Sequence, residues 1–543
     1  MFTPMRKVLA IPTLLFVAFG IILIFRTSGI GVDGNRYFML FDDAMISMRY
    51  AWNFAHGYGL VWYPGNYIQG YSNLLMTLLM ALPAIFLDRS AAVLVVQLFG
   101  LFLVPATAFL MDRIVDRFLL DKDTVHRKTI RLLVFCVVLF YYPLAYWSLF
   151  GMETGLLTFL TAAMMYFALQ FERSSDRRSA LWMGICAGAA FLTRNESATT
   201  TVLVFAFLMW PLQRERNIRR HLGALVVAAA IFAVCVIGEL GFQRMYYGEF
   251  LPNTYTLKVA GFALIDRVRN GVAYSAPFVL SMSVMILVAV IGVLSRPRAR
   301  EVLLLGSFGV ALAYQIYVGG DAWPPYWRFT TPTTPLLTTI FVIAVDRLLF
   351  RVQQRSLVGA QILTTIFVVA GLAASTWPFF LHRLKLATAP REFSSAAGNA
   401  DDNYRVKWLK TAMALREVLK EDASIGVIAA GVIPYYSDDT QPRRTVDFLG
   451  KVDRKVASLP PHMEPYVNLW TPLFWPGHNK YDLTYSIEQL QPDFIQGYEW
   501  GESVKPWAAA HYVRVKYKGV ELILLRDSKN VRWELLPKTM LPL

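Results

Sequence analysis

Residues 180–211 read ALWMGICAGAAFLTRNESATTTVLVFAFLMWP, an apolar stretch that is interrupted in its middle by the charged segment TRNE. Basic connectors flank it, ERSSDRR before it and QRERNIRR after it. Short loops rich in Lys and Arg stay in the cytoplasm, so both ends of the stretch are predicted to lie there. Two short helices therefore meet at TRNE, which places Arg194 and Glu196 in the outer part of a helical bundle.

The whole chain shares this apolar character. It has 543 residues, of which 56% are hydrophobic, and a mean hydropathy of +0.42, values that indicate a polytopic membrane protein. The formal net charge of +15 is concentrated in short loops, where it sets membrane orientation, so no nucleic-acid partner is expected. All three cysteines fall inside apolar runs, and neither a disulfide framework nor a thiolate metal site is expected. We expect no metal and no cofactor.

Apolar runs recur along the first 380 residues. The first, which ends at Phe25, lacks a small-residue cleavage signal and is interpreted as an uncleaved span. The run Tyr71–Leu87 is predicted to be re-entrant or interfacial, because the basic connectors then all lie inside. About eleven spans remain, and this odd number places the C-terminus outside. The candidate spans are 8–25, 91–110, 131–149, 154–171, 180–193, 196–211, 221–240, 272–294, 302–318, 332–349 and 357–379.

Two domains are predicted, a transmembrane catalytic domain over 1–380, with an outer loop at 26–90, and a soluble extracytoplasmic α/β domain over 381–543. In the second domain, Tyr404–Leu419 has helical periodicity. SIGVIAA at 424–430, DFIQGY at 493–498 and a hairpin over 513–525 are typical of short strands. The predicted class is therefore mainly α with a C-terminal α/β module, in a multi-pass protein of the cell (inner) membrane.

The outer loop contains FDDAMISMRYAWNFAHGYGLVW, residues 41–62. Its spacing predicts an amphipathic helix over 44–56, with Asp42 as its N-cap and Gly57 at its end. Such a helix is expected to lie on the bilayer with its apolar face down. One stripe is polar and the other apolar: Asp42, Arg49, Asn53 and His56 against Met45, Met48, Trp52 and Ala55.

With this topology, the unusual polar segments all reach the outer face of the bilayer. Ionisable groups at a membrane boundary are costly and usually mark a pathway or a reaction site. Segments far apart in the sequence are therefore predicted to converge: the pair Asp42 and Asp43, QGYSN at 69–73, GMETG at 151–155, TRNE at 193–196, YYGEFLPNTYTLKV at 246–259 and GGDAWPPYWRF at 319–329.

In their order along the chain, these segments resemble the C-type (GT-C) glycosyltransferase superfamily, and within it the mycobacterial terminal arabinofuranosyltransferase and its bacterial relatives. The resemblance also includes GVIPYYSDD and VDFLGKVDRKVA in the outer domain. It implies an acidic pair in the first outer loop and a polyprenyl-phosphate sugar donor used on the extracytoplasmic side. The implied acceptor is a cell-envelope glycan, with arabinofuranose as the first guess for the sugar.

The residue types suit this chemistry. One carboxylate, Asp42 or Asp43, would deprotonate the acceptor hydroxyl, and cations would stabilise the departing phosphate. A single base without a second nucleophile predicts inversion. The expected phosphate ligands are Arg194, Arg328 and Lys258 in the first place, and Arg49 and His56 in the second. The expected substrate contacts are Glu153, Glu196, Asp321, Trp323, Tyr326, Trp327, Tyr71 and Asn73.

Other interpretations remain open at this stage. The alternative for Asp42 is a simple helix cap, which the sequence context around it makes the less favoured interpretation, and the alternative for Arg194 with Glu196 is a structural ion pair. Tyr435, Tyr436 and Asp438 are expected to stabilise the outer domain rather than to act in catalysis. A lipid-linked sugar flippase or transporter would also use intramembrane charges, although no inverted repeat is visible. A non-catalytic scaffold of envelope synthesis would need only the spans and the outer domain.

Overall fold

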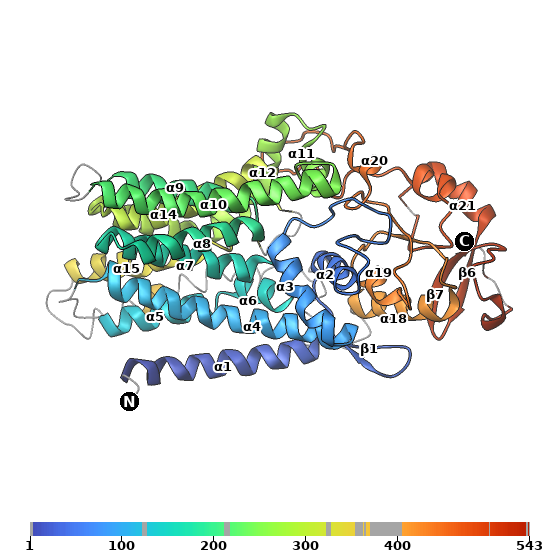
Figure 1. Cartoon of the computed structure of the whole chain (residues 1–543), viewed down its shortest axis with the longest axis horizontal. Helices are drawn as coiled ribbons and strands as arrows, with labels where there is room; N and C mark the ends of the chain where they lie inside the picture. Colours follow the sequence, from blue (N-terminus) through green and yellow to red (C-terminus); the bar gives the residue numbers. More distant parts are fainter. Residues whose placement is uncertain are drawn as a thin grey trace.

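In the computed structural model, a bundle of long helices forms one part of the molecule, and a smaller module of helices and strands packs against one end of it (Figure 1). The structure describes residues 4–121, 127–210, 218–321, 327–352, 362, 365–369, 404–498, 500–538 and 541. The expected sugar contacts Trp323 and Tyr326 lie outside these residues.

The bundle is built from helices that coincide with the predicted apolar runs. The break at TRNE lies between α8 and α9, as predicted. The helices are α1 (Pro4–Arg26), α4 (Arg89–Ile114, continued by η1, Val115–Leu119), α5 (Arg127–Leu139), α6 (Tyr142–Leu149), α7 (Thr154–Ser174), α8 (Arg177–Thr193), α9 (Ser197–Met209), α10 (Ile218–Tyr247), α12 (Leu264–Ser281), α13 (Ser283–Ser295), α14 (Ala299–Tyr317) and α15 (Thr334–Val352).

The predicted count of about eleven spans is not confirmed. Within the described residues, 5 helices are long and apolar enough to cross a membrane, or up to 7 if each bent pair forms one span. The pairs α5–α6 and α12–α13 bend by 45° and 77°. Hydropathy alone does not reveal such breaks, and most of the predicted span 357–379 lies outside the described residues.

The described parts of the basic connectors 112–131, 172–178 and 296–300 meet, with the start of 346–355, at the end of the bundle that lies away from the C-terminal module (Figure 1). Ion pairs join them to one another: Arg298–Asp121 at 2.7 Å, Arg300–Glu172 at 2.8 Å and Arg347–Glu301 at 2.5 Å. Segments predicted to lie in the cytoplasm thus share one end of the molecule, as the charge pattern requires.

The loop after α1 is folded against the other end of the bundle. It begins with the hairpin of β1 (Gly29–Ile30) and β2 (Arg36–Tyr37) and continues into α2 (Asp42–Ala55) and α3 (Leu74–Phe86). With 13 residues, α3 is too short to cross a bilayer, in agreement with its prediction as a non-spanning helix.

The predicted placement of α2 on the bilayer surface is wrong. Met45 and Met48, on its apolar stripe, are fully buried in a protein core with Met76, Met80 and Tyr435. Helix α2 packs against α3 and against the C-terminal module, so other protein elements, rather than lipid, cover its apolar face.

The C-terminal module contains one five-stranded sheet, of order β4-β3-β5-β7-β6. Strands β3 (Ile425–Val427), β4 (Thr445–Asp447) and β5 (Phe494–Ile495) are parallel, and β7 (Val520–Leu525) with β6 (Tyr512–Tyr517) forms the predicted antiparallel hairpin. The remaining elements are α18 (Tyr404–Val418), α19 (Val432–Ser437), α20 (Arg454–Ala457), η4 (Thr484–Gln489), η5 (Glu502–Val504), α21 (Lys505–His511) and η6 (Trp533–Leu535). The short strand β4 was not predicted, and the turn that follows it reaches the site described below.

Candidate active site

A cavity of about 340 Å³ lies where the bundle, the outer loop and the C-terminal module meet. Helix α2 contributes Asp43, the segment before α3 contributes residues 70–73, and the α8–α9 break contributes residues 194–196. Helix α11 (Asn253–Val259), absent from the prediction as a separate element, contributes Lys258. The predicted convergence of distant polar segments is therefore present in the structure.

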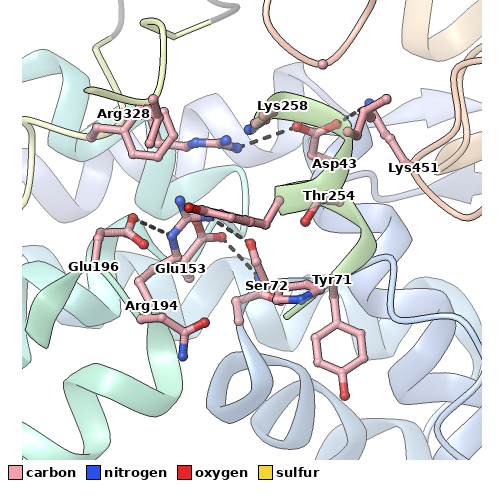
Figure 2. Close-up of a pocket in the computed structure, with 18 of the residues that line it drawn as sticks. Asp43, Tyr71, Ser72, Glu153, Arg194, Glu196, Thr254, Lys258, Arg328 and Lys451 are labelled. Carbon is pink, nitrogen blue, oxygen red and sulfur yellow. Dashed lines mark hydrogen bonds and ion pairs between the residues drawn. The ribbon is translucent and has the colours of Figure 1, made fainter. Parts of the chain in front are cut away.

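Three cations surround one aromatic ring on the wall of this cavity. The guanidinium carbons of Arg194 and Arg328 lie 5.2 and 5.4 Å from the ring centroid of Phe329, and the Lys258 Nζ lies 5.5 Å from it. Cation–π contacts of this kind are individually worth about 0.5–2 kcal/mol and hold each charge at the ring face. Figure 2 shows Arg328 and Lys258 on one side of the cavity and Arg194 across from them.

Arg194 is the most fully neutralised of these cations. Its Nε donates to Glu196 at 2.6 Å, and its Nη1 donates to Glu153 at 3.3 Å and to Ser72 Oγ at 2.9 Å. Asn73 in turn donates to the other oxygen of Glu153 at 3.0 Å. Glu153, Glu196 and Asn73 thus line the cavity, and their hydrogen bonds fix the orientation of Arg194.

Lys258 and Arg328 are less completely paired. Among the described residues, no carboxylate lies within ion-pair distance of Lys258, and the Arg328 Nε is buried without a hydrogen-bond partner. Burial, together with the nearby cations Arg328 and Arg194, lowers the pKa of Lys258 to about 8. Among the described residues, two cations that line the cavity are therefore only partly satisfied by protein partners, which is the electrostatic setting of an anion site.

Asp43 is the carboxylate that faces these cations. It accepts from Lys451 Nζ at 2.7 Å and pairs with Arg328 Nη1 at 3.5 Å, while its side chain is 25% exposed to the cavity. Burial raises the pKa of Asp43, but Lys451 and Arg328 outweigh that effect, and the pKa lies below its usual range. Asp43 is therefore ionised at neutral pH.

Asp42 does not line the cavity, and the prediction that it caps α2 is wrong. It lies within α2 and makes no side-chain cap bond, and Phe41 occupies the N-cap position. Its carboxylate instead accepts from the backbone N–H groups of Gly431 and Val432, at 3.3 and 2.9 Å, where α19 begins. Neighbouring residues on a helix point about 100° apart, and here this separation assigns the two carboxylates to different partners.

Arg49 and His56, which were predicted to bind phosphate, do not line the cavity either. The guanidinium of Arg49 is fully buried and forms two hydrogen bonds with Asp438, at 3.0 and 2.9 Å. His56 is exposed, stacks on Trp52 with ring centroids 4.2 Å apart, and bonds the carbonyl of that residue. Of the polar stripe of α2, Asp42 and Arg49 therefore face the C-terminal module, whereas Asn53 donates to the carbonyls of Val61 and Trp62 in the outer loop.

Of three other expected substrate contacts, Asp321, Trp327 and Tyr71, only Tyr71 lines the cavity. Asp321 does not line the cavity. Its carboxylate accepts a hydrogen bond from the backbone N–H of Arg328 at 2.8 Å and so holds the backbone of that arginine. Trp327 is only 1% exposed, adopts a positive φ of 39° and packs on Phe278. Tyr71, in contrast, lines the cavity as expected, and its hydroxyl bonds that of Tyr247 at 3.0 Å.

Lys451 and His478 of the C-terminal module also line the cavity, and sequence reasoning did not select them. Burial, together with the nearby Lys451 cation, lowers the pKa of His478 to about 3, so this imidazole is neutral. Counting Lys451, the lining carries four side chains with a formal positive charge (Arg194, Lys258, Arg328, Lys451) and three with a formal negative charge (Asp43, Glu153, Glu196), a formal excess of one positive charge. Within the described ranges, no three His, Cys, Asp or Glu side chains gather into a metal site.

The fold is that of the GT-C glycosyltransferases. The crystal structure of ArnT from Cupriavidus metallidurans in the apo state aligns with a TM-score of 0.53 at 12% identity, over 94% of this chain and 97% of that chain. The structure of the same protein bound to undecaprenyl phosphate aligns with a TM-score of 0.54 at 10% identity, over 95% and 98%. The GT-C resemblance of the sequence is confirmed at the level of fold.

Other comparisons add less. A family described as Domain of unknown function (DUF8728) matches residues 395–533, within the predicted outer domain. The arabinofuranosyltransferase AftD from Mycobacteria aligns with a TM-score of 0.43 at 14% identity, over 81% of this chain and 33% of that chain, a likeness too low to bear on the sugar. No curated protein sequence matches the chain.

Proposed function

We propose that this protein is a membrane glycosyltransferase that moves a sugar from a polyprenyl-phosphate donor to a cell-envelope glycan on the extracytoplasmic side. The observation that supports this most is the cluster of Arg194, Lys258 and Arg328 around Phe329, with an ionised Asp43 opposite it. Cations and one carboxylate are the groups that transfer from a lipid phosphate requires. The fold shared with ArnT, which was crystallised with undecaprenyl phosphate, supports the same donor class.

In the proposed reaction, the donor phosphate binds to Arg328 and Lys258, whose donors are only partly satisfied by partners among the described residues. Arg194 completes the cluster, oriented by Glu153 and Glu196. The acceptor oxygen attacks the anomeric carbon, the bond from that carbon to the phosphate oxygen breaks, and its electron pair leaves with the phosphate. Asp43 takes the proton of the acceptor hydroxyl. A single attack inverts the anomeric configuration, and arabinofuranose remains our first guess for the sugar.

Loading the purified protein with undecaprenyl phosphate and determining its structure tests the proposed site. We expect phosphate density within hydrogen-bond distance of Arg328 and Lys258, with the isoprenoid directed toward the membrane. Phosphate density elsewhere, with the cavity empty, would reject this site.

The contribution of Arg328 to donor binding is also measurable. Changing Arg328 to Ala should weaken undecaprenyl-phosphate binding by about 1.5–3 kcal/mol, the range for hydrogen bonds to charged groups. Arg328→Lys should recover only part of this loss, because an ammonium does not reproduce the guanidinium fork. The measurement is ligand-induced thermal stabilisation in detergent, with Arg416→Ala, in an exposed ion pair of the C-terminal module, as the matched control. Equal stabilisation of the Arg328→Ala and Arg416→Ala proteins would remove Arg328 from the donor site.

The proposed topology places the C-terminal module and the cavity outside the cell. A labelling position in the C-terminal module must be exposed. Ser437 in α19 is fully buried, whereas the side chain of Glu502 in η5 is 84% exposed. We expect Glu502→Cys to react with a membrane-impermeant maleimide in intact cells. Asp121→Cys, 67% exposed at the opposite end, should react only after permeabilisation. The reverse pattern would place the C-terminal module in the cytoplasm and contradict the proposed use of an extracytoplasmic donor.

A further inference from the structure

The C-terminal module contributes a charged side chain to the cavity through the turn that follows β4. Lys451 lies in this turn, and its Nζ is 2.7 Å from Asp43 Oδ1, the shorter of the two ion pairs that Asp43 makes (Figure 2). The Lys451 side chain is 11% exposed, and among the hydrogen bonds of the described residues its Nζ donates only to Asp43. A buried ammonium with one carboxylate partner is a specific arrangement, because burying it without a partner is costly.

The turn is built to hold this lysine in place. The buried carboxylate of Asp447 accepts from the backbone N–H groups of Leu449 and Val452, at 3.0 and 2.8 Å. Gly450 has a φ of +75°, and a Cβ there would lie 2.9 Å from the backbone nitrogen of Ala457, so only glycine fits. The conformation of the turn is therefore set by its own residues.

The turn is also fixed to the membrane domain. Asn253, the first residue of α11, donates through its side chain to the carbonyls of Gly450 and Lys451, at 2.8 and 3.1 Å. The same short helix carries Lys258 into the cavity. On the other side, Asp42 bonds the first turn of α19, so α2 holds the C-terminal module with the residue next to Asp43. Lys451 and Asp43 thus meet across an interface that is tied on both sides.

We propose that Lys451 is a positioning residue that holds Asp43 Oδ1, so that Oδ2 stays directed into the cavity to take the acceptor proton when the donor phosphate draws Arg328 away. This inference rests on the proposed function. It gives the matched domain of unknown function, residues 395–533, a role in the active site: its turn supplies the group that orients the base.

The ion pair between Lys451 and Asp43 affects how the activity depends on pH. Asp43 acts as a base only when ionised, so activity falls as the pH drops through its pKa, which the cations hold low. The groups that face Asp43 are Lys451 from the turn, Arg328 before α15, His478 from the loop after α20, Lys258 of α11 and Asp42 beside it. Removing the Lys451 charge should therefore raise the pKa of Asp43 and shift the acidic limb of the profile to higher pH.

The test compares Lys451→Met with the wild type, with Lys451→Arg, and with Lys455→Met as the matched control on an exposed lysine of the same module. The readout is kcat/KM for transfer from a polyprenyl-phosphate sugar between pH 3 and 9, for each protein that elutes as a folded species. Because the pKa of wild-type Asp43 lies below its usual range, the wild type should show no acidic fall in activity down to about pH 4. For Lys451→Met we expect the acidic limb to move up by about 1–3 pH units, the shift that one opposite charge at this distance produces, so that activity falls within the measured range where the wild type is still flat. Lys451→Arg should keep the wild-type limb, as should Lys455→Met.

A wild-type acidic limb in folded Lys451→Met would overturn the inference, even if its rate were lower, because a merely structural lysine changes stability and not this limb. Should Lys451→Met fail to fold, Lys451→Cys replaces it, with and without alkylation to aminoethylcysteine. Recovery of the low-pH limb on alkylation supports the role, and no recovery overturns it. Absence of transfer by the wild type itself would instead refute the proposed function, so the two failures are distinguishable.

Discussion

Replacing Asp43 by Asn is expected to lower turnover by about 10²- to 10⁴-fold, the effect of removing a general base. Asn has nearly the size of Asp and keeps an acceptor for Lys451, but it cannot take a proton at neutral pH. Since Asp43 is the carboxylate that faces Arg328 and Lys451 in the cavity, no neighbouring group replaces it there. The measurement is transfer per enzyme by purified protein, with expression and thermal unfolding recorded in parallel.

Asp42→Asn is the matched control, because it changes the adjacent residue of the same helix. Asp42 bonds the backbone of Gly431 and Val432 instead of lining the cavity, so the control should lose less than about tenfold in turnover, as expected for one or two weakened hydrogen bonds. An inactive Asp42→Asn protein beside an active Asp43→Asn protein would transfer the role of base to Asp42 and contradict the geometry.

Breaking the pair between Arg49 and Asp438 is expected to have the largest effect on stability. Both side chains are fully buried, and Arg49 also donates to Thr445 Oγ1 and to the carbonyl of Arg443, each at 2.9 Å. Arg49→Met would leave the Asp438 carboxylate buried, with Arg89 at 4.0 Å as its nearest remaining charge. Removing one partner of such a pair costs about 3–5 kcal/mol.

Thermal unfolding in detergent measures this cost, and Arg416→Met is the control. Arg416 pairs with Asp439 in the same module at 3.1 Å, but the two side chains are 47% and 36% exposed, so its loss should cost less than about 1 kcal/mol. Equal stability of the two variants, together with lost donor binding in Arg49→Met alone, would restore the sequence-based assignment of Arg49 to the phosphate.

The sequence predicted much of the fold because membrane helices leave a local signal. Apolar runs and basic loops located the helices of the bundle, and the break at TRNE appears between α8 and α9 as expected. The terminal hairpin was found from its alternation around Gly519. What hydropathy did not show were the bends in α5–α6 and α12–α13 and the strand β4, whose three residues are too few for a periodicity.

The site was predicted in part for the same reason. Asp43, Arg194, Lys258 and Arg328 stand out as charges beside apolar runs, and they do line one cavity. Asp42, Arg49 and His56 were grouped with them because they share a stripe on α2, yet a stripe does not tell whether it faces a ligand or another domain. Lys451 carries no such signal, since it is one lysine in a polar module about 400 residues from its partner in the sequence. Only the folded arrangement brings it to Asp43.

The most direct test of the central claim is sugar transfer by the purified protein from defined polyprenyl-phosphate sugars. Arabinofuranose, glucose and mannose donors would be offered with envelope glycans from cells that lack this protein, and released polyprenyl phosphate would be measured together with glycosylated product. We predict that one donor supports release and product in equal amounts, and that Asp43→Asn abolishes both. No release from any donor, with movement of intact lipid-linked sugar across proteoliposomes instead, would contradict the account and identify a transporter.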